Sequence, residues 1–257
     1  MESLEATLVR ARNLDPAELA DDIESMGFEC TRCGACCTAE ADEDHTATVF
    51  PDEIRTLQSV TDGEWRDVAR PMPYGLEVDE AGRPVGETFE WAIATTDCGD
   101  CRFYTEDDAG VGACSVHADR PLICQTYPFS LALAGTSQPM GDPVDDAGVV
   151  RAHECEGLGR DISRADARSL ARTLKTRAIR ELEEAIAVRD RFESVSAPVV
   201  VHDSEGAKRP DGTPIDDRQT TATSGSAAEG TQSINFDDSP TDDDQLTGSH
   251  DSPTENA

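Results

Sequence analysis

The sequence predicts a small α+β protein in which bound metal organises an irregular domain of short hairpins and helices. A long C-terminal amphipathic helix and a disordered acidic tail follow. Three observations predict this class. All nine cysteines lie between residues 30 and 155, apolar residues recur every four positions over 163–193, and that spacing is lost from about residue 196. The predicted parts are an N-terminal helical segment (1–27), a cysteine domain (28–160), the helix (161–194) and the tail (195–257).

The N-terminal segment predicts two short helices. The second should cover Pro16–Ser25, because Asp15 suits an N-cap and proline is favoured at the first helical position. Gly27 should end it.

Short elements are expected through the cysteine domain. "TATVF" alternates like a strand, and "PDEIRTLQSV" predicts a helix that begins at Pro51. Turn residues at "DEAG" and at 107–110 predict two hairpins. Pro121 should begin a helical turn.

Residues 163–193 predict a helix of about eight turns with one apolar stripe. The stripe consists of Leu170, Leu174, Ala178, Ile179, Leu182 and Ile186. This stripe should pack on the cysteine domain or on a second copy of itself. The polar composition after residue 195 predicts disorder, because too little apolar surface is available to offset the ordering entropy.

The charge excludes some partners. The net charge is −31, and residues 195–257 carry 13 acidic and 3 basic residues, which leaves −21 on residues 1–194. A chain this acidic repels nucleic acid and anionic membranes. Acidic residues spread along the whole chain, together with only two lysines, are typical of proteins from haloarchaea, where molar salt screens the repulsion.

The compartment follows from what the sequence lacks. No apolar stretch approaches the ~20 residues that span a membrane, and the first residues do not resemble a secretory signal. We therefore predict a soluble cytoplasmic protein. Cytosolic thiols stay reduced, so clustered cysteines there are more often metal ligands than disulfides.

The cysteine spacing predicts metal binding. Cys30, Cys33 and Cys36 are three residues apart, and Cys98 and Cys101 repeat that spacing. Such a turn brings two thiolates to one ion, as in zinc and iron–sulfur proteins. Redox-active thiols without metal and buried structural cysteines are the alternatives. Cys36 and Cys37 should not share an ion, because neighbouring side chains diverge on strands and helices. Either one of them is a spectator, or the two serve different metals or two corners of one cluster.

The motifs "CTRCGACC", "CRFYTEDDAGVGACSVHADRPLICQTYPF" and "CEGLG" resemble the YkgJ-type cysteine-cluster family, which is described as zinc- or iron-chelating. The resemblance covers residues 28 to about 160. It implies eight metal-binding cysteines, enough for two sites, and an arginine that offsets a negative cluster. The implied metal ligands are Cys30, Cys33, Cys36, Cys37, Cys101, Cys114, Cys124 and Cys155, and the arginine is Arg120. The alternative for Arg120 is an ion pair with a carboxylate such as Asp119.

Four residues depart from this assignment or extend it. Cys98 is additional to the family pattern, His117 stands where tyrosine is common, and Gln125 stands where arginine is common. His117 and His153 are expected to lie beside the metal site or on the surface and not to bind metal, since eight cysteines are available.

These observations support three hypotheses. The first is an iron–sulfur or zinc protein of redox or metal-handling type. The second is a non-catalytic zinc-stabilised module that binds an unknown protein partner. The third is an enzyme with an auxiliary cluster, although the sequence identifies no catalytic residue and no substrate.

Overall fold

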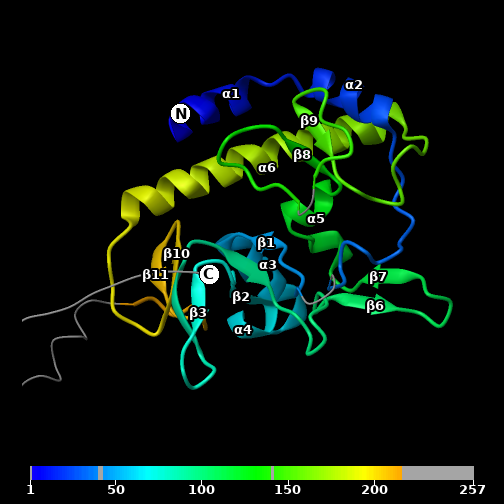
Figure 1. The fold of residues 1–257 in the computed structure, drawn as a ribbon. Helices are drawn as coiled ribbons and strands as arrows, with labels where there is room; N and C mark the ends of the chain where they lie inside the picture. The colour runs from blue at the N-terminus through cyan, green and yellow to red at the C-terminus, as the bar shows by residue number, and fades with distance from the viewer. Residues whose placement is uncertain (1, 40–42, 140–141, 216–257) are drawn as a thin grey trace, which may run out of the picture. The chain divides into compact units, whose positions relative to one another are not determined.

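The computed structural model describes residues 2–39, 43–139 and 142–215 (Figure 1). It confirms the α+β class, with several small sheets and one long helix. The described residues belong to one compact unit, Met1–Asp217. The prediction of a disordered tail falls, from residue 216 onward, outside the described residues.

The helices are α1 (Leu4–Asn13), α2 (Pro16–Met26), α3 (Pro51–Thr61), α4 (Trp65–Val68), α5 (Leu122–Thr126) and α6 (Arg164–Arg191), with a 3-10 turn η1 at His117–Asp119. Helices α2, α3, α5 and α6 lie where the sequence predicts, and α4 and η1 are additional. The Asp15 carboxylate caps α2 by accepting from the Ala17 amide at 2.8 Å. Gly27 ends α2 with φ of 70°, which glycine adopts without steric cost.

The strands form four sheets within the described residues. Their bounds are β1 (Thr48–Val49), β2 (Ala69–Pro71), β3 (Leu76–Val78), β4 (Pro84–Thr88), β5 (Trp91–Ile93), β6 (Tyr104–Glu106), β7 (Gly112–Cys114), β8 (Phe129–Leu131), β9 (Val150–Ala152), β10 (Val199–Asp203) and β11 (Gly206–Lys208). The strand orders are β1-β5-β2, β11-β10-β4-β3, β6-β7 and β8-β9. The two predicted hairpins are β3–β4 and β6–β7.

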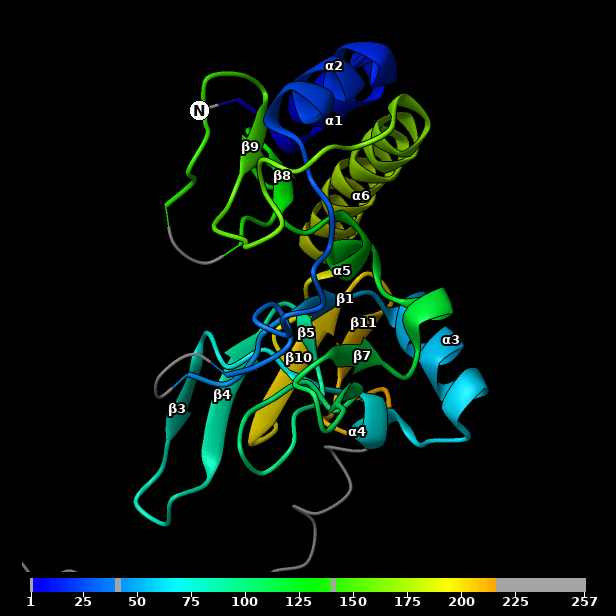
Figure 2. The same cartoon turned by 90° about the vertical axis from the view of Figure 1, so that its right-hand side faces the viewer.

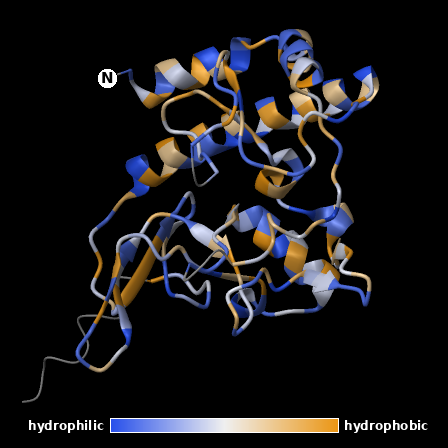
Figure 3. Ribbon diagram, turned by 45° about the vertical axis from the view of Figure 1, so that its right-hand side comes forward, coloured by the Kyte–Doolittle hydropathy of each residue, from blue (hydrophilic) through white to orange (hydrophobic). Residues whose placement is uncertain are grey.

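Two hydrophobic cores hold these elements. The first, here called the helical core, joins α1, α2 and α6 to β8 and β9 (Figure 2). Leu174, Ala178 and Leu182 of the predicted α6 stripe are buried in it, and Leu170, Ile179 and Ile186 pack against it. Figure 3 shows hydrophobic and hydrophilic residues alternating along this helix, as expected for one that buries a single face.

The second core, here called the cysteine-side core, lies among α3, α4, β1, β2, β5 and β10. Its buried members are Val49, Ile54, Leu57, Val68, Ala69, Trp91, Ile93, Cys101, Phe103, Val116 and Val201. Three further cysteines pack against it, namely Cys37, Cys114 and Cys124. Thiols are therefore part of this core's packing.

The prediction that disorder begins at residue 195 is wrong for residues 199–208. Strand β10 pairs in parallel with β4, and Val200 and Val201 are both 0% exposed. The Asp203 carboxylate accepts from Trp91 Nε1 at 2.9 Å and from Lys208 Nζ at 2.7 Å. Three successive valines supply enough apolar burial to hold the strand despite its polar flanks.

A buried polar network joins α6 to α5 and β8. Arg177, 2% exposed, donates to Glu181 at 2.8 Å, to Thr126 at 3.0 Å and to the Ser137 carbonyl at 2.6 Å. The Arg177–Glu181 ion pair is important because either charge, buried alone at this position, would destabilise the fold.

No described helix combines the length and hydropathy needed to cross a bilayer.

Candidate metal centre

A loop between α2 and β1 carries the first four cysteines. The Arg32 carbonyl accepts from the Gly112 amide at 2.8 Å, which ties the loop to β7. Gly34 has φ of 83°, and a Cβ there would lie 2.1 Å from the Tyr104 hydroxyl oxygen. Only glycine fits so close to that ring.

Backbone hydrogen bonds bring Cys37 to Cys101 and Cys114. The Cys101 amide donates to the Cys37 carbonyl at 2.7 Å. In the β6–β7 hairpin, Cys114 is the pairing partner of Tyr104. Cys124 reaches the same core from α5. These four cysteines, Cys37, Cys101, Cys114 and Cys124, are called the core group below.

A different set of backbone bonds brings Cys30 to Cys155. The Glu29 amide donates to the Gly157 carbonyl at 3.0 Å, and Phe28 and Leu158 form an antiparallel bridge. The Gly157 amide points at Cys155 Sγ at 3.4 Å. Cys30, Cys33 and Cys36 are exposed, and Cys155 is half-buried. These four cysteines are called the surface group.

Electrostatic interactions between the sulfurs follow the same division. Burial and then the charges of Cys101, Cys36 and Cys114 raise the pKa of Cys124. Burial also raises the pKa of Cys155, and the charges of Cys33, Cys36 and Cys30 add to that effect. Since charge interactions weaken with distance, each group contains sulfurs that are neighbours in space. Cys36 influences both groups.

The expectation that the Cys36 and Cys37 side chains diverge is wrong. Their sulfurs lie 3.7 Å apart. Both residues sit in a turn that the Cys37 amide closes onto the Gly34 carbonyl at 2.7 Å, so neither strand nor helix geometry applies. With zinc–sulfur bonds of about 2.3 Å, two ligands of one tetrahedral ion are separated by about 3.8 Å. The pair can therefore share one ion.

The hydrogen bond between these two sulfurs polarises the pair. The Cys37 thiol stabilises a Cys36 thiolate, which lowers the pKa of Cys36 to about 7. The same bond, with burial, raises the pKa of Cys37. Cys36 is thus the readily ionised member, and the thiolate is the form that binds metal.

Arg120 places a positive charge near both groups. Its charge lowers the pKa of Cys36, after the larger effect of the Cys37 hydrogen bond, and opposes the effect of burial on Cys124. Arg120 Nε donates to the His117 carbonyl at 3.1 Å. Among the described residues no carboxylate forms an ion pair with Arg120, so its charge is free to act on the sulfurs.

The remaining sequence candidates lie elsewhere. Cys98 Sγ contacts Thr96 Oγ1 at 3.1 Å and Asp100 Oδ2 at 3.5 Å. His117 is exposed on η1, and the charge of Arg120 lowers its pKa. His153 is 2% exposed and its Nε2 is 2.8 Å from Ser130 Oγ. Each therefore has local partners other than the sulfurs.

His45 is a residue that the sequence did not single out. Its Nε2 lies 3.1 Å from the Cys36 carbonyl oxygen, and its Nδ1 is buried with no hydrogen-bond partner in the described part of the chain. Burial lowers the pKa of His45, so the ring is neutral near pH 7. No spacing links His45 to the cysteine motif, because the contact depends on how the loop folds back.

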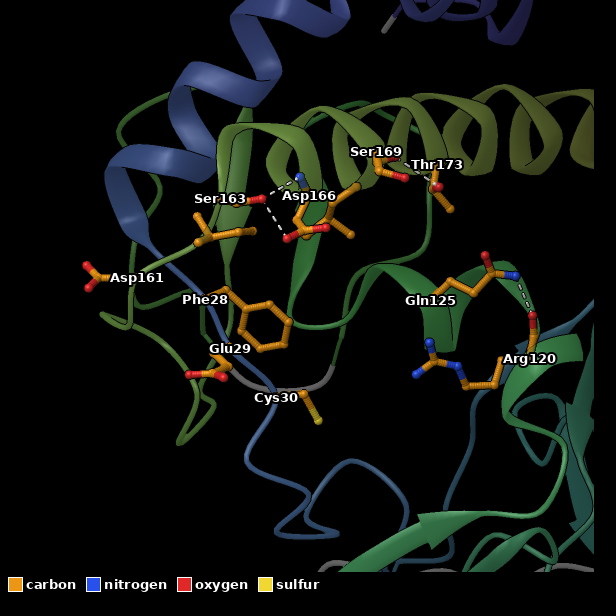
Figure 4. Close-up of a pocket in the computed structure, with 12 residues that line it drawn as sticks. Phe28, Glu29, Cys30, Arg120, Gln125, Asp161, Ser163, Asp166, Ser169 and Thr173 are labelled. Carbon is orange, nitrogen blue, oxygen red and sulfur yellow. Dashed lines mark hydrogen bonds between the residues drawn. The ribbon is translucent and has the colours of Figure 1, made fainter.

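A cleft of about 460 Å³ opens beside the surface group. Figure 4 shows Cys30 and Arg120 on one side and Ser163, Ser169 and Thr173 of the α6 region on the other. The lining is polar and includes the exposed thiol. A molecule in this cleft would contact Cys30 directly.

The donor chemistry fits zinc or iron, because soft thiolates are the ligands that these sites use. Among the described residues, however, no three His, Cys, Asp or Glu side chains already stand in position to hold an ion. The sulfurs are gathered by region, and metal binding would require them to close in further.

Comparison with protein families agrees with this donor set. Residues 29–156 match the family model CxxCxxCC, described as "putative zinc- or iron-chelating domain". Residues 29–156 are a CxxCxxCC domain. Comparisons with curated proteins and with solved structures found no match. The CxxCxxCC domain contains both cysteine groups, whereas α1, α2, α6 and β10–β11 lie outside the matched residues.

Proposed function

We propose that this protein binds zinc or iron at two unlike cysteine groups and handles metal through one of them. The core group would hold a metal that completes the fold. The surface group would bind a metal that can pass to or from another molecule at the cleft. The observation that carries the proposal is the difference in exposure: Cys101 is 6% exposed within a hydrophobic core, whereas Cys30, Cys33 and Cys36 are exposed.

Burial decides how easily a metal leaves. A chelator must reach the ion before it can compete, and in the core group Cys101 is buried while Cys37, Cys114 and Cys124 are half-buried against β1, β5 and β10 residues. Three members of the surface group are exposed to solvent, and one of them, Cys30, lines the cleft. Cys36 lies between the groups, 3.7 Å from Cys37. This position would let one cysteine serve as the link between the two sites.

Zinc and iron–sulfur clusters are both bound by cysteine thiolates, so the ligands alone do not distinguish them. Anaerobic purification followed by zinc, iron and acid-labile sulfide analysis distinguishes them. Visible absorption with sulfide supports a cluster and the redox form of the function. Colourless protein with zinc supports metal handling.

The exchange model is tested by chelator competition on the loaded protein. Two phases of metal release are expected, and Cys30→Ser should remove the fast phase. Cys124→Ser should remove the slow phase and lower the melting temperature, because it acts inside the cysteine-side core. Cys98→Ser is the matched control, since its sulfur contacts Thr96 and Asp100. A single phase that Cys30→Ser and Cys124→Ser alter equally would contradict two unlike sites.

A second candidate function is an enzyme with an auxiliary cluster, favoured by the cleft that Cys30 and Arg120 share. Under this function the metal would not exchange. Slow release from both groups, together with ligand-induced protection of the cleft residues, would favour it over metal handling.

A further inference from the structure

A second cavity, of about 540 Å³, lies between the C-terminal half of α6 and the strands β1 and β5. No cysteine lines it. Its walls hold five of the chain's twelve aromatic residues, namely Phe50, Tyr74, Phe89, Trp91 and Phe192. The volume lies within the range of small-molecule sites, and the aromatic content is far above that of the chain as a whole.

Three aromatic side chains at the mouth of the cavity are exposed to solvent. Tyr74 is 60% exposed, Phe89 48% and Phe192 46%. The rings of Phe89 and Phe192 are 5.9 Å apart, and both pack on His202, which is 2% exposed. Keeping three large aromatic side chains in contact with water opposes folding. Their retention beside a cavity is typical of a binding surface.

Three glutamates give the cavity a negative charge. Glu181 is paired with Arg177 at 2.8 Å, and Glu184 accepts from the Ser204 amide at 2.8 Å. Among the described residues the Glu90 carboxylate has no hydrogen bond and no ion pair, although burial raises its pKa, as do the charges of Glu181 and Glu184. Arg189, also in the lining, is already paired with Glu5 and Asp190 at 2.7 Å each. No described side chain therefore pairs with Glu90, which is exposed to solvent.

We propose that this cavity binds a small organic cation, whose alkylated ammonium group lies against the aromatic rings and is balanced by Glu90. Aromatic faces attract such cations, most strongly where water is excluded. An anion would be repelled by the three glutamates. A neutral apolar ligand would cover Glu90 without supplying a partner, which is unfavourable. A bare metal ion would need several converging oxygens, and three of the four lining carboxylates are already engaged, since Asp203 accepts from Trp91 and Lys208.

The test uses the full chain and a matched pair of probes. Choline and 3,3-dimethylbutan-1-ol have the same shape, but only choline is charged. We expect choline to bind about tenfold more tightly in calorimetric titrations at one fixed salt concentration, because only its charge attracts the rings and Glu90. Trp91 lines the cavity, so tryptophan fluorescence should report the same binding. Equal affinity for the two probes, or no binding of either, would overturn the proposal.

Two variants assign the site. Glu90→Gln and Phe192→Leu should each weaken choline binding, the first about tenfold. The matched control is Glu80→Gln, an exposed glutamate in the turn between β3 and β4, which should bind choline as the unaltered protein does. Phe192 is half-exposed, so Phe192→Leu tests the site even where Glu90→Gln perturbs folding. Unchanged binding in both variants would place the cation elsewhere and refute this site.

The same cation can come from a free molecule or from a protein side chain. Titration with Nα-acetyl-Nε-trimethyllysine amide separates the two sources. Tighter binding of this probe than of choline assigns the cavity to a partner's modified lysine, and the reverse assigns it to a free small cation. The outcome is independent of metal content, which the cavity does not involve.

Discussion

The helical core and the cysteine-side core are built differently. The helical core contains no cysteine among its buried members, and its α6 stripe packs apolar residues against α1, α2 and β8–β9. The cysteine-side core includes Cys101 and is bordered by Cys37, Cys114 and Cys124. Hydrophobic burial suffices for the first core, whereas the second is completed by cysteines that we propose as metal ligands.

Charge distinguishes α6 from the cysteine-bearing residues. Residues 161–194, which contain α6 (Arg164–Arg191), carry 8 basic and 7 acidic residues. Residues 28–160 carry 9 basic and 26 acidic residues. Most of the repulsion in the described chain therefore falls on the cysteine side. We expect this side to be the less stable one without metal and at low salt.

The largest effect should come from removing β10 and β11. A chain that ends at residue 197 loses the burial of Val199, Val200 and Val201, and with it about 5 kcal/mol or more of stability. That loss is comparable to the whole stability of a small domain. Hydrogen exchange should show the cysteine side open while α1, α2 and α6 stay protected.

A chain that ends at residue 215 is the control, since it keeps every described strand. If the shorter chain melts like the control, β10 does not hold the cysteine-side core together.

Arg177→Met should destabilise the helical side by about 3–5 kcal/mol, because it leaves Glu181 buried without its cation. Burial already raises the pKa of Glu181. A carboxyl with a raised folded pKa is stabilising when protonated, and that contribution is lost as pH rises through the folded pKa. The loss of stability caused by Arg177→Met should therefore become smaller as pH falls from 7 toward the range in which Glu181 protonates. Urea unfolding across pH measures this.

The double variant Arg177→Met/Glu181→Leu is the matched control and should recover most of the loss. A double variant as unstable as the single one would show that Arg177 acts through its other bonds, to Thr126 and Ser137.

Salt should act mainly on the cysteine side. On raising potassium chloride from ~0.1 M to ~3 M, the melting temperature should increase by several degrees, because screening reduces repulsion among the acidic residues. Hydrogen exchange at the lower salt should increase first in residues 43–115. Equal melting temperatures at both salt concentrations would contradict the halophilic interpretation.

The smallest effect concerns Glu205, which pairs with Arg55 and with Lys208. The Arg55 hydrogen bond lowers the pKa of Glu205 to about 2. A lowered folded pKa gives stability above the unfolded pKa of 4.5 that is lost as pH falls toward 2. Because the side chain is 40% exposed, Glu205→Gln should cost only about 1 kcal/mol at pH 7.

That difference should decrease as pH falls below 4.5 and disappear only below pH 2, where Glu205 is protonated in the folded protein as well. Glu77→Gln, exposed on β3 at the far edge of the same sheet, controls for the loss of one negative charge. A Glu205→Gln deficit that is independent of pH would contradict the ion-pair explanation.

The sequence predicted elements whose signals are local. Asp15 and Pro16 specified the start of α2, and the four-residue recurrence around Leu174 specified α6. Strand β10 was missed although Val199–Val201 is an apolar run, because the run is shorter than the polar segment around it. Whether such a run is buried depends on β4, far away in the chain.

The prediction of the metal-binding cysteines was also limited to what local spacing can show. Spacing identified which cysteines suit metal, but not that Cys155 lies with Cys30, which depends on the Phe28–Leu158 bridge. The direction of the Cys36 and Cys37 side chains depends on a turn closed at Gly34. Sequence spacing carries no information on either contact.

The parallel pairing of β10 with β4 has a consequence for biosynthesis. Val199 pairs with Gly86, a separation of 113 residues, and contacts so distant in sequence form late. On the ribosome, all nine cysteines emerge before β10 is made. The nascent cysteine side therefore has an open β4 edge and accessible thiols until residues 199–203 arrive. If the core group holds metal as proposed, the ion would enter most easily during that interval, before the last strand closes the core.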